Sequence, residues 1–148
     1  MKLKPLLVIA LTSLFIQQAN ASEVVEQGEK LFTNYCSACH GVSSGKGMSN
    51  RLAPPIIAVK RHYLGTYSDE QSFVKAVADW VEKPDESKTL MRGAIRRFKI
   101  MLPMPFPRAD VEKIASYIFK GNVEKPAGFD QHFKDEHKKG KGKGKNLN

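Results

Sequence analysis

The only two cysteines of the chain stand three positions apart, in the stretch CSACH of residues 36–40, and a histidine directly follows the second one. Two thiols at this spacing can each add to one of the two vinyl groups of a haem. The next residue then lies under the ring, where its imidazole can bind the iron. Cys36, Cys39 and His40 therefore indicate one covalently attached haem c, with His40 as an axial ligand of the iron.

Other chemistries also use closely spaced cysteines, and they fit this sequence less well. Redox-active C-x-x-C dithiols belong to a strand-then-helix context, whereas this pair follows GEKLFTNY, a helical pattern. A structural zinc site needs further ligands at short spacing, and the chain has no second cysteine pair. A simple disulfide, which export would favour, leaves the histidine behind Cys39 unexplained. Haem attachment accounts for all three residues.

An iron held by one histidine has a sixth position, and its occupant separates an electron carrier from a ligand binder or an enzyme. Met101 and Met104 lie in FKIMLPMPFP, a proline-rich loop just before a helical pattern. Methionines in a helical stripe usually fill a core, but their place in such a loop favours a ligand role for one of them. His62 is an alternative ligand, although the polar stretch KRHYL favours a surface position.

Gly28 and Phe32 form a G-x-x-x-F pattern ahead of the haem motif, and Tyr117 lies in DVEKIASYIF near the end of the last helical pattern. In these features the chain resembles the class I c-type cytochromes, which are small monohaem electron carriers. The resemblance runs from about Glu26 to Phe119. It implies an all-α, single-domain cytochrome c fold, in which helices wrap around one haem and the N- and C-terminal helices cross. Gly28, Phe32 and Tyr117 would be packing residues at that crossing.

The resemblance also implies residues that complete the haem site. In the family, a proline carbonyl accepts a hydrogen bond from the ring N–H of the ligating histidine, which orients the imidazole and raises its basicity. Pro54 and Pro55 both fit, and Pro54 is preferred because Ile56 then falls where the family places an apolar residue against the haem. Met101 keeps the usual loop length to the last helix and is the preferred iron ligand. Met104 precedes a proline, as in the family's M-P motif, and is the alternative.

The elements that must position these residues are helical by pattern, since no alternating apolar run indicates a strand. Ser68 and Gln71 read as a capping box for a helix that Pro84 ends. A second helix is expected after Ser87, and Asp110 is expected to cap the last one. The predicted inner face of the second helix is Leu90, Met91, Ala94, Ile95 and Phe98, and that of the last is Val111, Ile114, Ala115 and Ile118. The aromatic residues Tyr63, Tyr67 and Trp80 could line the haem or simply fill the core.

Three segments follow from the overall composition. Residues 1–21 read as a secretory signal peptide that is cleaved near Ala21, because two lysines precede a short apolar run, so the protein is expected in the periplasm without a transmembrane anchor. Residues 22–126 suit one domain. Residues 127–148 are rich in lysine and glycine and are predicted to be disordered.

The chain carries a net charge of +9. A basic cluster just before the methionine loop predicts redox partner proteins with acidic docking surfaces, although it could be only a solvated helix face; its members are Arg92, Arg96, Arg97 and Lys99. Nucleic acid is disfavoured, because the tail lysines alternate with glycine rather than with stacking aromatics. The tail could instead touch an anionic membrane surface weakly.

The sequence thus predicts a one-electron carrier rather than an enzyme. Two alternatives stay open. The chain could be the haem subunit of a larger oxidoreductase complex, with the basic tail as a docking arm. If both loop methionines left the iron, an open sixth position would allow peroxidase activity or gas binding.

Overall fold

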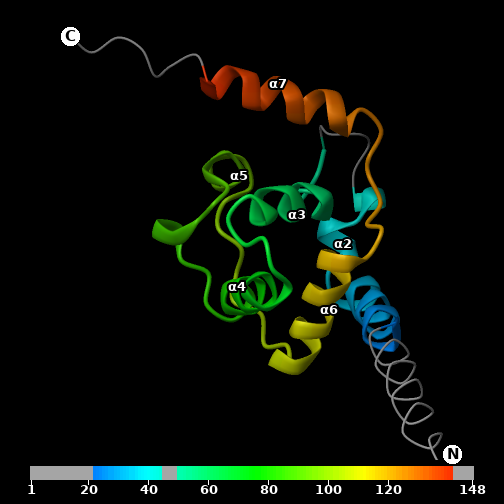
Figure 1. Cartoon of the computed structure of the whole chain (residues 1–148). Coiled ribbons are helices and arrows are strands. Elements are labelled where there is room, and N and C mark those ends of the chain that lie inside the picture. Colours follow the sequence, from blue (N-terminus) through cyan, green and yellow to red (C-terminus); the bar gives the residue numbers. More distant parts are fainter. Residues whose placement is uncertain (1–21, 45–49, 142–148) are drawn as a thin grey trace, which may run out of the picture.

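The computed structural model describes residues 22–44 and 50–141, and within these ranges the chain forms helices and no strand (Figure 1). The N-terminal helix covers residues 22–35. After it come α2 (Ser37–His40), the 3₁₀ turn η1 (Val42–Ser44), α3 (Ile56–Leu64), α4 (Glu70–Glu82), η2 (Glu86–Lys88), α5 (Arg92–Phe98), α6 (Arg108–Lys120) and α7 (Phe129–Lys141). The predicted all-α fold is confirmed. The proposed signal peptide lies outside the described residues, and none of the described helices has the length and apolar character needed to cross a membrane.

The N-terminal helix and α6 pack closely side by side at Gly28. A Cβ atom at Gly28 would lie only 2.1 Å from the carbonyl oxygen of Lys113, so no larger residue fits without moving one helix. One turn further along, the rings of Phe32 and Tyr117 meet with their centroids 5.8 Å apart. The crossing implied by the resemblance is therefore present, and it fixes the helix that leads directly into the cysteine pair.

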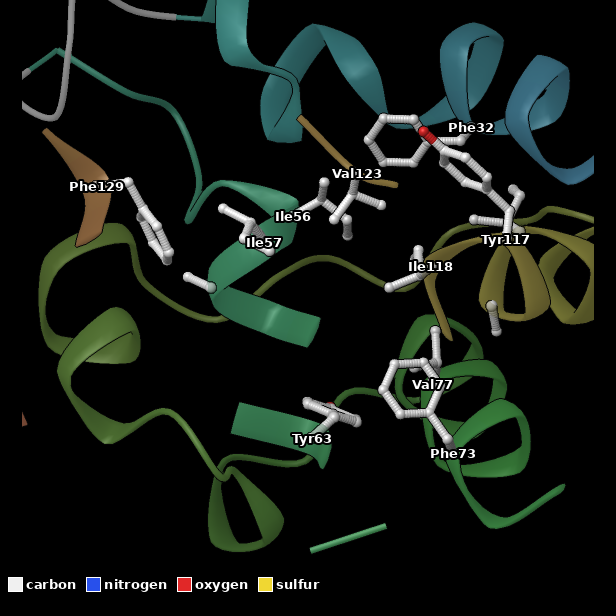
Figure 2. Close-up of a cluster of buried hydrophobic side chains, with 13 residues drawn as sticks. Phe32, Ile56, Ile57, Tyr63, Phe73, Val77, Tyr117, Ile118, Val123 and Phe129 are labelled. Carbon is white, nitrogen blue, oxygen red and sulfur yellow. The ribbon is translucent and has the colours of Figure 1, made fainter. Parts of the chain in front are cut away.

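The core lies between α3, α4 and α6, as Figure 2 shows. Phe73 of α4 is fully buried, and the predicted inner face of α6 is buried at all four positions: Val111, Ile114, Ala115 and Ile118. Ile56 and Ile57, at the start of α3, belong to the same cluster. A helix periodicity of 3.6 residues gathers such apolar positions on one face, which is why the sequence pattern identified them.

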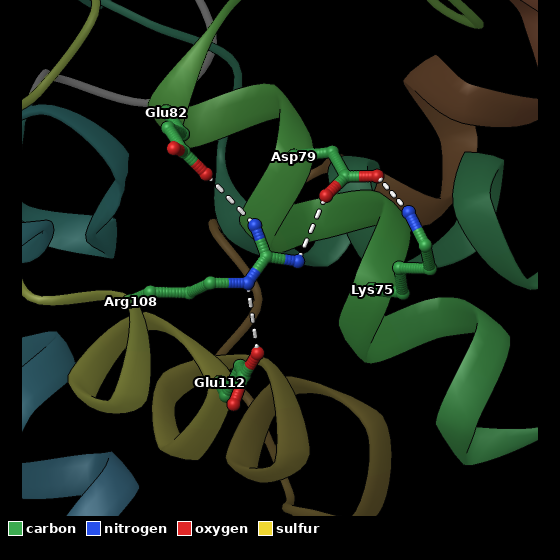
Figure 3. Close-up of polar contacts among 5 residues, drawn as sticks. All are labelled: Lys75, Asp79, Glu82, Arg108 and Glu112. Atoms are coloured by element: carbon green, nitrogen blue, oxygen red, sulfur yellow. Dashed lines mark hydrogen bonds and ion pairs between the residues drawn. The ribbon is translucent and has the colours of Figure 1, made fainter.

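Arg108 joins α6 to α4 at the edge of this core (Figure 3). Its guanidinium donates to Glu82 and Asp79 of α4, each at 2.8 Å, and to Glu112 of α6 at 3.0 Å. These carboxylates raise the pKa of the Arg108 guanidinium. Because Arg108 is the first residue of α6, the network fixes the end of the loop that carries Met101 and Met104.

Helix boundaries differ from the sequence expectation at three places. Asp69, rather than Ser68, caps α4 by accepting a hydrogen bond from the Ser72 N–H. Pro107 precedes α6, which puts Asp110 inside the first turn instead of at the cap. The segment after Pro84 forms the short turn η2, which the Asp85 side chain caps, and α5 begins only at Arg92. Leu90 and Met91, expected on the inner face of that helix, instead pack against the core from the segment before it.

The expectation of a disordered tail is wrong for residues 129–141, which form α7. Phe129 and Phe133 are one turn apart and face α3, where Phe129 is 2% exposed. The Arg61 guanidinium lies 4.9 Å and 5.0 Å from the centroids of these two rings. Lysines and acidic residues dominate the composition of this segment, so the short apolar stripe was not recognised from the sequence. The packed part of the chain extends beyond residue 126.

Candidate functional site

The cysteine pair and His40 share a single helical turn. Cys36 directly follows the N-terminal helix and donates its backbone N–H to the Phe32 carbonyl at 2.9 Å, so that helix fixes the position of Cys36. His40 closes the turn by donating its backbone N–H to the Cys36 carbonyl at 2.9 Å. Gly41 then lets the chain turn away, since a Cβ atom there would lie 2.5 Å from the Ser37 carbonyl oxygen. The local backbone thus groups two thiols and one imidazole.

Both thiols are free, and the environment of Cys36 differs from that of a reactive cysteine. Burial, with the neighbouring Cys39 as a second cause, raises the pKa of the Cys36 thiol to about 11. Redox-active C-x-x-C motifs lower the pKa of a cysteine to favour the reactive thiolate. The environment of Cys36 therefore disfavours the reactive thiolate that a dithiol oxidoreductase needs, which argues against that interpretation of the motif.

His40 is held by a backbone acceptor on the segment before α3. Its Nδ1 lies 2.8 Å from the Pro54 carbonyl oxygen, which accepts a hydrogen bond from this nitrogen and leaves Nε2 available to bind a metal. Burial lowers the pKa of His40, the charge of Arg51 lowers it further, and the hydrogen bond to Pro54 acts in the opposite direction. The imidazole is therefore neutral near pH 7, which is the form that can coordinate iron.

The two adjacent prolines have different roles in the structure. The Pro55 carbonyl accepts the backbone N–H of Ala58 at 2.8 Å and so begins α3, while the Pro54 carbonyl faces His40. Pro54 thus makes the contact that the sequence analysis preferred for it. Ile56 is 8% exposed within the core, and its contact with a haem stays a prediction.

Arg51 is a positioning residue that the sequence analysis missed. It is only 7% exposed, and its guanidinium donates to the Gly41 carbonyl, with a longer contact of 3.5 Å to the Val42 carbonyl. It therefore ties the chain just after His40 to the segment that carries Pro54. Arginine is rarely buried unless it is paired, so no local sequence signal indicated this place.

The methionine loop, residues 99–107, connects α5 to α6, and both of its methionines are half-buried. Met104 donates its backbone N–H to the Val81 carbonyl near the end of α4, at 3.1 Å. Phe106 stacks on Tyr35, the residue directly before Cys36, with ring centroids 4.5 Å apart. These contacts hold the second half of the loop between α4 and the end of the N-terminal helix.

Tyr63, Tyr67 and Trp80 line a hollow of about 410 Å³ together with Leu90 and charged residues of α4 and the segment after it. The lining, as far as the described residues go, includes neither the CSACH turn nor the methionine loop. Tyr63 belongs to the core cluster and Tyr67 packs against it, whereas Trp80 is half-buried at the hollow. Their expected part in a haem pocket stays a prediction.

The donor set fits a covalently attached haem. One turn supplies two free thiols and a neutral imidazole whose second nitrogen is engaged by a carbonyl, and the methionine loop supplies two thioethers. Thiol addition and imidazole coordination are the interactions that hold such a cofactor, and a thioether is one of the ligands that can take the sixth position of the iron. His62, the alternative sixth ligand, instead packs against Phe133 and His137 of α7.

The family model described as "Cytochrome c" matches residues 25–121 of the 148. No curated protein and no solved structure matches the chain. The matched range includes the CSACH turn, Pro54 and the methionine loop, and it ends before α7.

Proposed function

Since the chain belongs to the cytochrome c family, whose members carry covalently attached haem c and transfer electrons, we propose that it is a class I monohaem electron carrier. Cys36 and Cys39 hold the haem, and His40 binds the iron from one side. The observation that carries this proposal is the single turn in which two free thiols stand beside an imidazole whose Nδ1 lies 2.8 Å from the Pro54 carbonyl.

On the other side of the iron, Met101 is the proposed ligand, with Met104 as the alternative. When bound, the haem supplies an iron that takes up or releases one electron. Pro54 keeps the His40 ring in one orientation and raises its basicity. A thioether ligand stabilises the ferrous form and thereby raises the reduction potential. If His40 and a loop methionine both bind the iron, no coordination site would be left for a substrate, which favours a carrier over a peroxidase or a gas binder.

The ligand assignment is tested by optical spectroscopy of protein matured in a host that attaches haem. The variants are Met101→Leu, Met104→Leu and the control Met91→Leu, since leucine keeps the volume of methionine and removes the sulfur. We expect oxidised wild-type protein to show the weak near-infrared sulfur-to-iron band, and only Met101→Leu to lose it. If Met104→Leu loses the band instead, Met104 is the ligand. A high-spin wild-type protein that binds carbon monoxide freely would refute the carrier proposal.

The proposed partners are redox proteins with acidic docking surfaces. Arg92, Arg96, Arg97 and Lys99 are all exposed on α5 and at its end, directly before the methionine loop. A positive surface near the cofactor steers an acidic partner and makes the association rate depend on salt. We expect Arg96→Glu to slow electron transfer to an acidic partner at low salt, with the difference shrinking at high salt. The control Lys134→Glu, at an exposed position of α7, should change the rate less.

Export to the periplasm, with residues 1–21 as the signal peptide, completes the proposal. Haem attachment through two thiols suits such a compartment if the thiols are kept reduced until the haem arrives. Fractionation of cells that express the full chain, with N-terminal sequencing of the product, tests both points. A product that starts at residue 22 in the periplasmic fraction is expected, and a cytoplasmic full-length product would contradict it.

Weak contact of the lysine-rich end with an anionic membrane surface is a further part of the proposal. Exposed Lys134 and Lys138 of α7 lie toward that end. Each lysine near an anionic surface contributes about 1 kcal/mol, and salt screens this attraction. Sedimentation with vesicles of anionic and of neutral lipid should show binding to the anionic vesicles alone, at low salt. Equal binding to both would contradict it.

A further inference from the structure

Tyr35 and Phe106 form a stacked pair outside the buried core. Their planes are 8° from parallel and their ring centroids are 4.5 Å apart. Tyr35 is 37% exposed, and neither ring belongs to the core cluster described above. The Tyr35 hydroxyl also donates to the Asp110 carboxylate at 3.4 Å, a long contact to the first turn of α6. An exposed aromatic contributes little to core burial, so the stack is the main interaction of Tyr35.

The two rings join the two segments that would hold opposite sides of the haem. Tyr35 directly precedes Cys36, and Phe106 comes two residues after Met104. The Met104 backbone and Arg108 fasten this part of the chain to α4, through Val81, Asp79 and Glu82. The stack differs from these contacts because it ties the methionine loop to the helix that leads into the CSACH turn.

We propose that Tyr35 and Phe106 are positioning residues, a clasp that holds the methionine loop over the haem and sets how firmly the methionine stays on the iron. The inference rests on the proposed function, because it requires a thioether at the sixth position. Without the stack, the loop would still be attached to α4 but would move more freely relative to Cys36. The methionine would then leave the iron more often.

The test measures competition for the iron in haem-loaded protein. Added imidazole binds only when the methionine has left, so a weaker methionine bond gives a proportionally tighter apparent affinity for imidazole. Loss of a stacked aromatic pair typically changes such an equilibrium constant by a factor of about two to ten. We therefore expect Phe106→Leu and Tyr35→Leu each to bind imidazole about two- to tenfold more tightly than wild-type protein.

Three further variants separate the clasp from a general loss of stability. Phe106→Tyr keeps the stack, and Tyr35→Phe keeps it while removing the hydrogen bond to Asp110, so both should stay near the wild-type affinity. Phe119→Leu removes a ring that lies 5.3 Å from Phe73, elsewhere in the fold, and should lower the unfolding temperature without changing imidazole affinity. The double variant Tyr35→Leu/Phe106→Leu should equal either single one, since the same contact is lost once.

An unchanged imidazole affinity in Phe106→Leu would overturn the clasp and leave the carrier proposal intact. Additive effects in the double variant would also overturn it, because the two rings would then act separately. A wild-type protein without the sulfur-to-iron band, or one that binds imidazole without displacing a ligand, would overturn both the clasp and the proposed methionine ligation. The optical spectrum of wild-type protein thus distinguishes the two failures.

Discussion

Replacing Gly28 with alanine should destabilise the whole domain, because this position allows the N-terminal helix to touch α6. The added methyl group would lie 2.1 Å from the Lys113 carbonyl oxygen and 2.9 Å from the Tyr117 Cβ, and the oxygen belongs to the backbone and cannot rotate away. The helices must therefore separate, which also loosens the contact between Phe32 and Tyr117.

Overpacking of this kind typically costs about 1 to 3 kcal/mol, and the backbone contact places Gly28→Ala near the upper end. At about 4 °C per kcal/mol for a domain of this size, the unfolding temperature should fall by about 8 to 12 °C. Gly93→Ala is the matched control, since a methyl group there meets nothing closer than the flexible Arg96 side chain at 3.9 Å. That variant should gain about 0.4 to 1 kcal/mol from a stiffer unfolded chain.

The assay is reversible unfolding of haem-loaded protein by guanidinium chloride and by heat, followed by far-ultraviolet circular dichroism. Both substitutions change the unfolded chain in the same way, so their difference reports the folded state alone. If Gly28→Ala were as stable as Gly93→Ala, the close crossing of the N-terminal helix and α6 would be refuted. The position of the cysteine turn, which follows from that crossing, would then need another explanation.

The remaining predictions concern α3, Arg51 and α7. Burial, with the charge of His137 as a second cause, lowers the pKa of His62 in the folded protein. In the unfolded chain His62 has its ordinary pKa of about 6.5, so below that pH the unfolded chain binds a proton more readily than the folded one. The contribution of His62 to stability is therefore complete above that pH and falls as the solution is acidified. Between about pH 7 and pH 5, urea unfolding should show a smaller loss of unfolding free energy in His62→Gln than in wild-type protein. Equal losses in the two proteins would contradict this. Arg51→Met should lower the unfolding free energy by about 2 kcal/mol, because a buried carbonyl loses a charged donor, whereas exposed Arg92→Met should change it little; equal effects would refute a positioning role. Phe133→Ala should release α7 from α3 and so speed amide hydrogen exchange in residues 129–141 with little change in α6; unchanged exchange would mean that the ring does not hold the helix.

Helix α7 extends the protein beyond the range that the family model matches, which ends at residue 121. It is fastened to α3 by the Arg61–Asp130 ion pair, the stacking of Arg61 on Phe129 and Phe133, and the rings of His62 and His137. The cytochrome c part of the chain therefore carries an added helix on α3, the helix that begins directly after Pro54 and Pro55. A basic docking arm and a packed helix are compatible, because Lys134 and Lys138 are exposed while Phe129 is buried.

Much of the site could be predicted from sequence because its chemistry is local. The CSACH spacing alone groups two thiols and an imidazole, since residues three and four apart share one helical turn. The buried face of α6 followed from apolar residues at helical spacing, and the turn chemistry of prolines placed Met101 and Met104 in a loop. The all-α fold and the haem family both follow from these short-range patterns.

What only the tertiary structure decided are contacts between segments far apart in the chain. By their residue types alone, Pro54 and Pro55 are equivalent acceptors. In the structure the Pro55 carbonyl accepts a backbone hydrogen bond at the start of α3, while the Pro54 carbonyl accepts one from His40. The Tyr35–Phe106 stack and the burial of Arg51 likewise depend on how distant elements pack, which no local propensity encodes. Disorder was predicted for residues 127–148 from their composition, but a stripe of Phe129, Phe133 and His137 becomes helical once α3 offers a surface, because packing rather than propensity supplies most helical stability in proteins.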